Sequence, residues 1–202
     1  MSTQLHPGSA GFTRDELEDA FRHYFLTGPV MEDWMAWSQL FTDDAVYFDH
    51  YYGRFRGPGE IQRFLETTMM FGKHCYTALE WYNIDGDRIV WKGINRADHP
   101  DPSRPPFEFP SLQIIHYAGG GRWSSEEDWW IQSEMRRYAK GYWEACQATD
   151  PDFPEQLSRR HWGHIEWARP PAGHEARPSW YGREAEIQVI RRIEDMDFGE
   201  RV

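Results

Sequence analysis

The chain has 202 residues, enough for one domain with an extension, and it carries a formal net charge of −11. So acidic a protein repels phosphate backbones and anionic lipids, which excludes nucleic acid and anionic membranes as expected partners. No apolar run is long enough to cross a membrane, and the first residues lack the pattern of a signal peptide. The two cysteines lie far apart in sequence and form no disulfide framework, so we expect a cytoplasmic protein.

The aromatic content is high: 11 Trp, 10 Tyr and 12 Phe make up 16% of the chain, although the mean hydropathy is only −0.80. Large rings therefore build much of the core. Two interpretations stay open, because rings pack efficiently in any core but also line cavities for flat, apolar ligands.

The first half of the chain predicts an arm, three helices and one strand. Residues 1–12 form the arm, and Thr13 with Glu16 makes a capping box at the start of a helix that ends near Thr27-Gly28-Pro29. The further predicted elements are a short helix at 32–41, a strand at 45–51, a corner at 53–59 and a helix at 60–71.

The second half predicts an antiparallel meander. Asp85-Gly86-Asp87 and Gly119-Gly120-Gly121 are hairpin turns, and the loop at 99–106 holds four prolines. The predicted strands are 75–84, 88–98, 110–118 and 122–134, followed by a helix at 135–148. Helices followed by a run of strands indicate an α+β fold.

Residues 149–202 differ in composition and are predicted to be a C-terminal extension. They are rich in Pro, Arg, His and Trp and too poor in aliphatic residues to fold alone, so we expect them to pack on the body or on a neighbouring subunit. A helix is predicted at 184–195. His161, His164 and Glu166 have no established metal-ligand spacing, and the chain has no P-loop, dinucleotide fingerprint or nucleophile elbow. No metal and no cofactor are therefore predicted.

Four stretches occur in an order that resembles a known family: LFTDDAVYFD, FRGPGEIQRFL, DGDRIVWKGINR and HYAGGGRWSSEEDWW. Together, over residues 13–147, the chain resembles the SnoaL-like branch of the nuclear transport factor 2-like superfamily. The resemblance implies a cone-shaped α+β barrel at 13–148, in which a curved, mostly antiparallel sheet is wrapped by three or four helices around an internal pocket. It also implies a homodimer or homotrimer.

The resemblance points to Asp49 and Tyr24 as catalytic candidates. In the related ketosteroid isomerases the general base ends a strand in the context D-D-A-x-x-x-D, which DDAVYFD matches at Asp49, and a carboxylate in an apolar pocket is a suitable base. An oxyanion-stabilising tyrosine on their first helix corresponds to Tyr24. The alternatives are a solvent-facing or turn-capping Asp49 and a core tyrosine. The third isomerase group falls near Gln113, which cannot exchange a proton, so steroid isomerisation is not expected.

Asp128 is a third catalytic candidate. Its context before Trp129-Trp130 resembles that of a catalytic aspartate in limonene epoxide hydrolases, and strand alternation places Glu126 on the same face. The alternative is a solvated acidic face. Because the paired Arg and Asp of those hydrolases have no counterpart in IVWKGIN, epoxide hydrolysis is not the first choice.

His50 is the fourth candidate, since it titrates near neutral pH. A regular strand sends Asp49 and His50 to opposite faces, so only one enters the cone unless a bulge intervenes. His116 is comparable, because scytalone dehydratases of this superfamily use histidines. A satisfied structural role is the alternative for both.

Further residues are predicted to contact the substrate. Lys92 would hold an alkoxide if it pointed inward, and otherwise faces solvent. The predicted substrate-binding residues are Trp34, Trp37, Tyr47, Trp91, Lys92, Asn95, Gln113, His116 and Trp129.

These observations predict a cofactor-independent acid–base lyase or isomerase that acts on an aromatic small molecule with a hydroxyl or carbonyl group. The reaction would be a dehydration, a proton shift or a retro-aldol deformylation like that of the diarylpropane lyases. The alternatives are a non-catalytic aromatic-ligand-binding or interaction module, and an epoxide hydrolase or polyketide cyclase. An enzyme requires a titratable group within hydrogen-bond reach of another inside the cavity, which a binding module does not.

Overall fold

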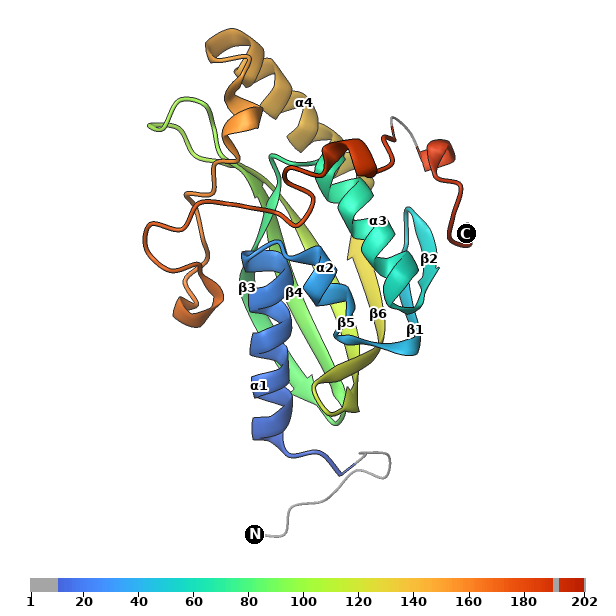
Figure 1. Cartoon of the computed structure of the whole chain (residues 1–202). Coiled ribbons are helices and arrows are strands. Elements are labelled where there is room, and N and C mark those ends of the chain that lie inside the picture. The colour runs from blue at the N-terminus through green and yellow to red at the C-terminus, as the bar shows by residue number, and fades with distance from the viewer. Residues whose placement is uncertain (1–10, 191–192, 202) are drawn as a thin grey trace.

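The computed structural model describes residues 11–190 and 193–201 (Figure 1). Most of the predicted N-terminal arm lies outside the described residues. The main elements are α1 (Arg14–Phe25), a π-helix (Leu26–Val30), α2 (Trp34–Ser38), β1 (Phe41–Asp49), β2 (Gly53–Arg56), α3 (Gly57–Phe71), β3 (Tyr76–Asp85), β4 (Arg88–Ala97), β5 (Phe107–Gly119), β6 (Arg122–Trp130) and α4 (Gln132–Thr149).

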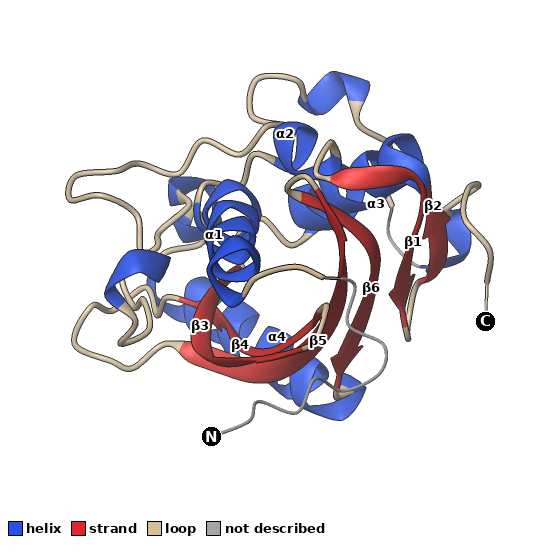
Figure 2. Cartoon of the chain, turned by 90° about the horizontal axis from the view of Figure 1, so that it is seen from below, coloured by secondary structure: helices blue, strands red, loops and turns tan. Residues whose placement is uncertain are grey.

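The six strands form one sheet in the order β2-β1-β6-β5-β4-β3. Neighbours are antiparallel except β1 and β6, which run parallel. The sheet bends into an arc, and α1 lies on its inner side (Figure 2). The predicted α+β class and the curved, mostly antiparallel sheet with its helices are confirmed.

The start of the chain follows its capping signals closely. The Thr13 hydroxyl accepts a hydrogen bond from the Glu16 amide at 3.2 Å, as the capping box predicts. The helix does not end at Thr27, however, because a wider turn continues it to Val30 and the Met31 amide donates to the Leu26 carbonyl at 2.9 Å.

The second helix and first strand have different bounds from those predicted. The Asp33 carboxylate accepts from the Ala36 amide at 3.0 Å, so α2 begins at Trp34 rather than at residue 32. The strand begins earlier than residue 45, because Phe41 already pairs with Trp123 of β6.

Both predicted hairpins are confirmed, with Asp85 opposite Arg88 and Gly119 opposite Arg122. β5 begins at Phe107, earlier than predicted, and it includes Pro110, as the predicted strand did. Proline is tolerated there because the pairing with β6 starts only at the next residue, so no hydrogen bond to that strand is lost. The last strand ends at Trp130, and residues predicted to extend it begin α4 instead.

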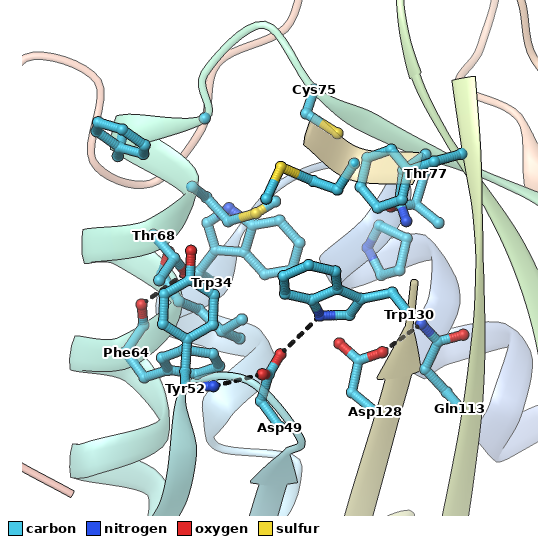
Figure 3. A pocket seen from close by; sticks show the side chains of 18 of the residues that line it. Trp34, Asp49, Tyr52, Phe64, Thr68, Cys75, Thr77, Gln113, Asp128 and Trp130 are labelled. Carbon is cyan, nitrogen blue, oxygen red and sulfur yellow. Dashed lines mark hydrogen bonds between the residues drawn. The ribbon is translucent and has the colours of Figure 1, made fainter. Parts of the chain in front are cut away.

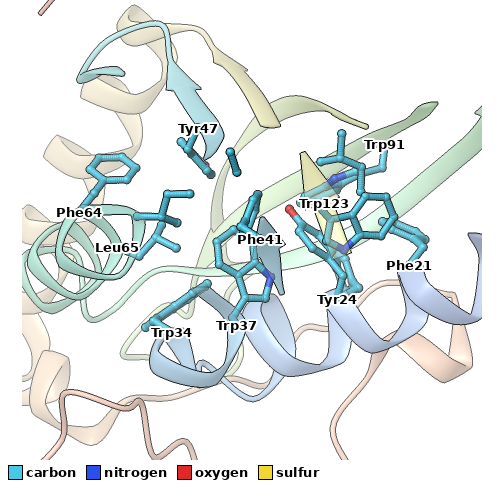
Figure 4. Packing of buried hydrophobic residues seen from close by; sticks show 14 of the residues in the cluster. Phe21, Tyr24, Trp34, Trp37, Phe41, Tyr47, Phe64, Leu65, Trp91 and Trp123 are labelled. Carbon is cyan, nitrogen blue, oxygen red and sulfur yellow. The ribbon is translucent and has the colours of Figure 1, made fainter. Parts of the chain in front are cut away.

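A cluster of aromatic side chains fills the space between α1, α2, α3 and the inner face of the sheet (Figure 4). Tyr24 lies 5.0 Å from Trp37 and 5.5 Å from Trp123, measured between ring centroids. Phe21, Phe41 and Trp123 are fully buried, and none of the three lines the cavity described below. Core packing therefore accounts for part of the high ring content.

The extension follows the surface of the body as loops and short turns. The predicted helix at 184–195 is absent from its described residues, which form only the turns Glu184–Glu186 and Ile193–Asp195. Buried Arg159 forms an ion pair with buried Glu32 at 3.0 Å and also donates to the Lys73 carbonyl at 2.6 Å. Polar contacts with the body, rather than the backbone hydrogen bonds of a helix, thus hold this part of the extension in place.

Asp98, directly after β4, is a second attachment point for the extension. Its carboxylate is 1% exposed and accepts hydrogen bonds from the hydroxyls of Tyr76 at 2.8 Å and Ser158 at 2.6 Å. Arg160 Nε and His161 Nδ1 donate to the same carboxylate at 3.1 and 2.8 Å. Burial pushes the pKa of Asp98 upward, but the hydrogen bonds outweigh it and hold the pKa below its ordinary value.

No helix among the described residues is long and apolar enough to cross a membrane. Cys75 and Cys146 are both free thiols.

Candidate active site

A cavity of about 360 Å³ opens into the concave side of the sheet (Figure 3). This volume is within the range of small-molecule sites, about 300–1,000 Å³. Side chains from α1, α2, α3, α4 and every strand except β2 contribute to a mostly aromatic and aliphatic wall. Three carboxyl groups enter this wall, namely Asp49, Glu126 and Asp128.

Asp49 ends β1 and is only 2% exposed. One carboxylate oxygen accepts the backbone amides of Tyr51 and Tyr52, both at 2.7 Å, and the other accepts the indole N–H of Trp130 at 3.1 Å (Figure 3). The residue thus caps the turn into β2 and lines the cavity at once, so the two roles that the sequence left as alternatives coincide.

Asp128 lies on β6 directly opposite Asp49 in the parallel pairing of the two strands. Its carboxyl group accepts the side-chain amide of Gln113 at 2.9 Å and the hydroxyl of Tyr47 at 3.2 Å. Residues paired in this way share a face of the sheet, so the two aspartates meet in one cavity.

Glu126, two residues earlier on β6, is 3% exposed and accepts the Tyr24 hydroxyl at 2.6 Å. Sequence reasoning placed Glu126 on the face of Asp128 but did not name it as a site residue. The signal that could have found it is this alternation, combined with the expectation that Asp128 points inward.

Burial determines the protonation of this carboxyl group cluster. It raises the pKa of Asp128 to about 8, with the negative charge of Asp49 as a further cause, and it raises the pKa of Glu126 well above its ordinary value. Burial also raises the pKa of Asp49, but the three N–H donors oppose that rise. Two neighbouring carboxyl groups do not readily ionise together, so we infer that Asp49 keeps the charge while Asp128 holds a proton.

The phenols of the site are neutral donors. Burial is the first cause that raises the pKa values of Tyr24 and Tyr47 well above normal, and the charges of nearby carboxyl groups add to it. None of the described residues that line the cavity is Lys or Arg. The buried carboxyl groups therefore have no cationic partner there.

Most predicted site residues line the cavity. These are Tyr24, Trp34, Trp37, Tyr47, Asp49, Trp91, Asn95, Gln113 and Asp128. The Asn95 side-chain oxygen already accepts the Thr77 hydroxyl at 2.7 Å, which orients its amide.

Four predicted residues lie on the outer face of the sheet instead. His50 follows Asp49 with the opposite orientation, donates to Glu127 at 2.7 Å and stacks on Trp129 at 3.5 Å. Lys92 forms an ion pair with Glu80 at 2.6 Å. His116 is three residues from Gln113 and so faces the other way. The expectation that His50, Lys92, His116 or Trp129 enters the pocket is corrected by strand alternation.

The structure also places residues in the cavity that the sequence did not indicate. Trp130, expected to continue a strand, curls over Asp49, while His74, Cys75 and Tyr138 line the opposite end. These side chains come from the end of β6, the residues before β3 and α4. No short-range pattern joins such segments.

Among the described residues, no group of three or more His, Cys, Asp or Glu side chains is arranged to hold a metal ion. The Nδ1 atom of His161 instead contacts Asp98.

Comparison with known proteins rests on structure. No family model and no curated protein matches the sequence. A protein from Shewanella putrefaciens assigned as a SnoaL-like polyketide cyclase superposes with a TM-score of 0.52 at 16% identity, covering 70% of this chain and 98% of its own. An LEH-like epoxide hydrolase of M. tuberculosis gives 0.52 at 18% identity, covering 66% and 96%.

The fold is that of the nuclear transport factor 2-like superfamily. A second SnoaL-like protein, from Shewanella denitrificans, covers 63% of this chain and 99% of its own with a TM-score of 0.50 at 14% identity. Neighbours with this fold include proteins assigned as enzymes, and identities this low establish the fold alone.

Proposed function

We propose that this protein is a cofactor-independent acid–base lyase or isomerase for an uncharged, apolar small molecule with an aromatic part and a hydroxyl or carbonyl group. The observation that carries the proposal is the pairing of Asp49 with Asp128 on adjacent strands in an aromatic cavity. One carboxyl group is equipped to hold a negative charge and its neighbour to hold a proton, which is the arrangement that acid–base chemistry at neutral pH requires.

Asp49 is the base in this proposal. Its carboxylate takes a proton from the carbon next to a carbonyl or hydroxyl-bearing carbon of the substrate. Desolvation strengthens it as a base, while the donors from Tyr51, Tyr52 and Trp130 fix its orientation.

Asp128 is the acid. Its proton goes to the substrate oxygen on which negative charge develops, or to a hydroxyl that leaves as water in a dehydration. Gln113 and Tyr47 hold its carboxyl group in place. In an isomerisation, Asp49 then gives its proton to a second carbon while Asp128 takes back the proton it gave to the oxygen. In a dehydration, the protonated hydroxyl leaves as water with the electrons of its C–O bond, and the proton left on Asp49 returns to Asp128.

Glu126 and Tyr24 support the acid. A neutral Glu126 beside Asp128 avoids a further negative charge in the cavity, and the Tyr24 hydroxyl fixes its orientation. In this proposal Tyr24 acts through Glu126 and does not itself contact the reacting atoms.

Two rival functions have less support. A binding module needs no titratable group beside another, whereas the Tyr24–Glu126 and Tyr47–Asp128 contacts bring such groups together inside the cavity. An epoxide hydrolase with an arginine between two aspartates is disfavoured, because the described lining residues include no arginine.

The test is a turnover screen with aromatic ketones, diols and epoxides, with products followed by mass spectrometry. For a converted compound, Asp49→Asn should lower kcat/KM by about 100- to 10,000-fold, the contribution typical of a general base. Binding, measured by tryptophan fluorescence, should change little because the amide has nearly the same shape.

The matched control is His50→Gln, the adjacent residue on the outer face of the sheet. It should leave kcat/KM within about twofold of wild type, as expected for a surface substitution. Full activity in Asp49→Asn, or tight binding of the panel with no turnover of any member, would refute the acid–base proposal.

A further inference from the structure

The end of the extension, residues 196–201, pairs with the edge of the sheet and is called the C-terminal segment below. β2 is the edge strand. The Arg54 amide donates to the Glu200 carbonyl at 2.7 Å, and the Glu200 amide donates to the Arg54 carbonyl at 2.8 Å. The chain thus ends beside β2, as Figures 1 and 2 both show. The segment gives β2 backbone partners on the side where the sheet has no further strand.

The same segment contacts the turn that joins β1 to β2. The Arg201 guanidinium donates to the Tyr52 carbonyl at 2.6 Å and to two carbonyls of its own segment at 2.8 and 3.0 Å. Gly53 has a φ of +119°, and a Cβ atom there would lie only 2.3 Å from the Glu200 carbonyl oxygen. The backbone of the segment therefore approaches the end of this turn more closely than a residue with a side chain would allow.

This turn also holds the carboxylate of Asp49. The amides of Tyr51 and Tyr52 both donate to one Asp49 oxygen at 2.7 Å, and Asp49 pairs with Gly53 across the turn. Tyr52 thus binds Asp49 through its amide and Arg201 through its carbonyl. The turn has the carboxylate on its inner side and the C-terminal segment on its outer side.

Contacts with the body attach the segment independently of the turn. Arg63 of α3 forms an ion pair with Asp197 at 2.6 Å, and its guanidinium lies 4.1 Å from the centroid of the Phe198 ring. The Phe198 ring is in turn 5.8 Å from that of Phe55, measured between centroids. Because these contacts already order the segment, Arg201 binds the turn at a smaller cost in conformational entropy.

We propose that the C-terminal segment, through Arg201 and the backbone of Glu200, positions Asp49 for proton transfer by holding the turn at 49–53 in one conformation. This inference rests on the proposed function, in which Asp49 is the base. Arg201 and Glu200 are positioning residues, because they lie outside the cavity and act through the turn. Displacing a catalytic group by about 1 Å can lower a rate about 100-fold, so such a contact can control the chemistry.

A turn that is released on its outer side should open more often, which has two consequences. The amides of Tyr51 and Tyr52 then leave Asp49 and exchange faster with solvent. Burial raises the pKa of Asp49, and the hydrogen bonds from these amides oppose that rise. Losing them should therefore raise the pKa of Asp49 further and move the acidic limb of the pH–rate profile to higher pH.

The experiment uses two variants of the full chain. Arg201→Ala removes the donors to the Tyr52 carbonyl, and Glu200→Pro removes the amide that donates to the Arg54 carbonyl. Circular dichroism and thermal melting check that each variant folds, and either variant suffices as the test if the other does not fold.

Hydrogen exchange of single backbone amides, followed by NMR, gives the first measurement and needs no substrate. Exchange at Tyr51 and Tyr52 should accelerate about tenfold in each variant, the change expected when about one hydrogen bond is lost. The amide of fully buried Ile115, in the middle of the sheet, should stay within about twofold of the wild type.

The matched control is Arg177→Ala, the same substitution elsewhere in the extension. The Arg177 side chain is 59% exposed, and its ion pair with Glu175 at 3.0 Å and its contact with the Tyr181 ring at 4.9 Å stay within the extension. Exchange at Tyr51 and Tyr52 should remain within about twofold of the wild type in this variant.

Kinetics with a converted compound give the second measurement. Arg201→Ala should lower kcat about tenfold and leave KM within about twofold, because the group that is displaced acts in the chemical step. The acidic limb of kcat/KM should move to higher pH. A segment that only stabilised the fold would lower the melting temperature and leave the pH dependence of the folded enzyme unchanged.

The proposal is overturned if exchange at Tyr51 and Tyr52 is unchanged in both variants, or if Ile115 accelerates equally, because the segment then stabilises the whole fold. It is also overturned if Arg201→Ala keeps the kcat and the pH profile of the wild type. Faster exchange confined to the turn, in a protein that converts no compound, would refute the acid–base function and retain the control of the Asp49 turn by the segment.

Discussion

The cavity cluster of Asp49, Glu126 and Asp128 and the isolated Asp98 are two sets of buried carboxyl groups with opposite properties. Asp98 is attended by Arg160, His161 and two hydroxyls, and its pKa lies below the ordinary value. Among the described residues, the lining of the cavity cluster includes no Lys or Arg, and the pKa values of its carboxyl groups are raised. Burial is common to both, so it does not by itself mark a functional site. The kind of partner distinguishes a structural anchor from a group that can exchange protons.

The largest predicted effect on stability separates the two sets. Asp98→Asn removes the charge that Arg160 and His161 share and turns one acceptor into a donor that faces other donors. The free energy of unfolding should fall by about 2–4 kcal/mol in urea denaturation. Asp49→Asn also turns one acceptor into a donor that faces an N–H group, but it removes a buried charge that has no Lys or Arg partner among the described lining residues, so the fall should be smaller.

The matched comparison is between these two isosteric substitutions. If Asp49→Asn destabilises the protein as much as Asp98→Asn, the carboxylate of Asp49 is a structural anchor too. The distinction between the two clusters would then fail.

The second prediction concerns pH. The pKa of Asp128 is raised to about 8, so its proton stabilises the folded state at low pH, and this contribution is lost as the pH rises from the ordinary value of 3.8 through about 8. Asp128→Asn should therefore weaken the loss of stability across that window, by at most about 1.4 kcal/mol per pH unit.

Asp98 has the opposite sign. Because its pKa is lowered, its contribution is present above the ordinary value and is lost as the pH falls through the folded-state pKa. In Asp98→Asn the free energy of unfolding should therefore fall less steeply as the pH is lowered below the ordinary pKa. Near neutral pH it should depend on pH as it does in the wild type. Unfolding free energies of Asp128→Asn and Asp98→Asn, measured over a pH series, test both predictions. If both variants depart from the wild type in the same pH range, the opposite pKa shifts assigned to the two residues are contradicted.

The smallest predicted effect is on the outer face of the sheet. Lys92→Ala removes an ion pair with Glu80 in which both side chains are about a third exposed or more (34% and 40%). Such pairs contribute about 0–1 kcal/mol, so unfolding free energy should shift within that range, and ligand binding in the cavity should be unchanged. A clear loss of binding would place Lys92 at the site after all.

The fold was largely predictable because its signals are local. The capping box at Thr13, the turns around Gly86 and Gly120 and the alternation along the strands each act over a few residues. The predicted helix at 184–195 was wrong, because tertiary contacts override local helix preference. Arg63, for example, donates hydrogen bonds to Gln188 and Asp197, which hold the extension in another path.

The sequence by itself determined the α+β architecture, the aromatic interior and the presence of Asp49 and Asp128 on strands. Only the tertiary structure decided which face of each strand points inward, which excluded His50 and Lys92 and admitted Glu126. It also decided that β1 and β6 run side by side in parallel, which brings two aspartates 79 positions apart into one register. The reason is physical: alternation fixes which residues share a face, but long-range pairing fixes which faces meet and how much water remains between them.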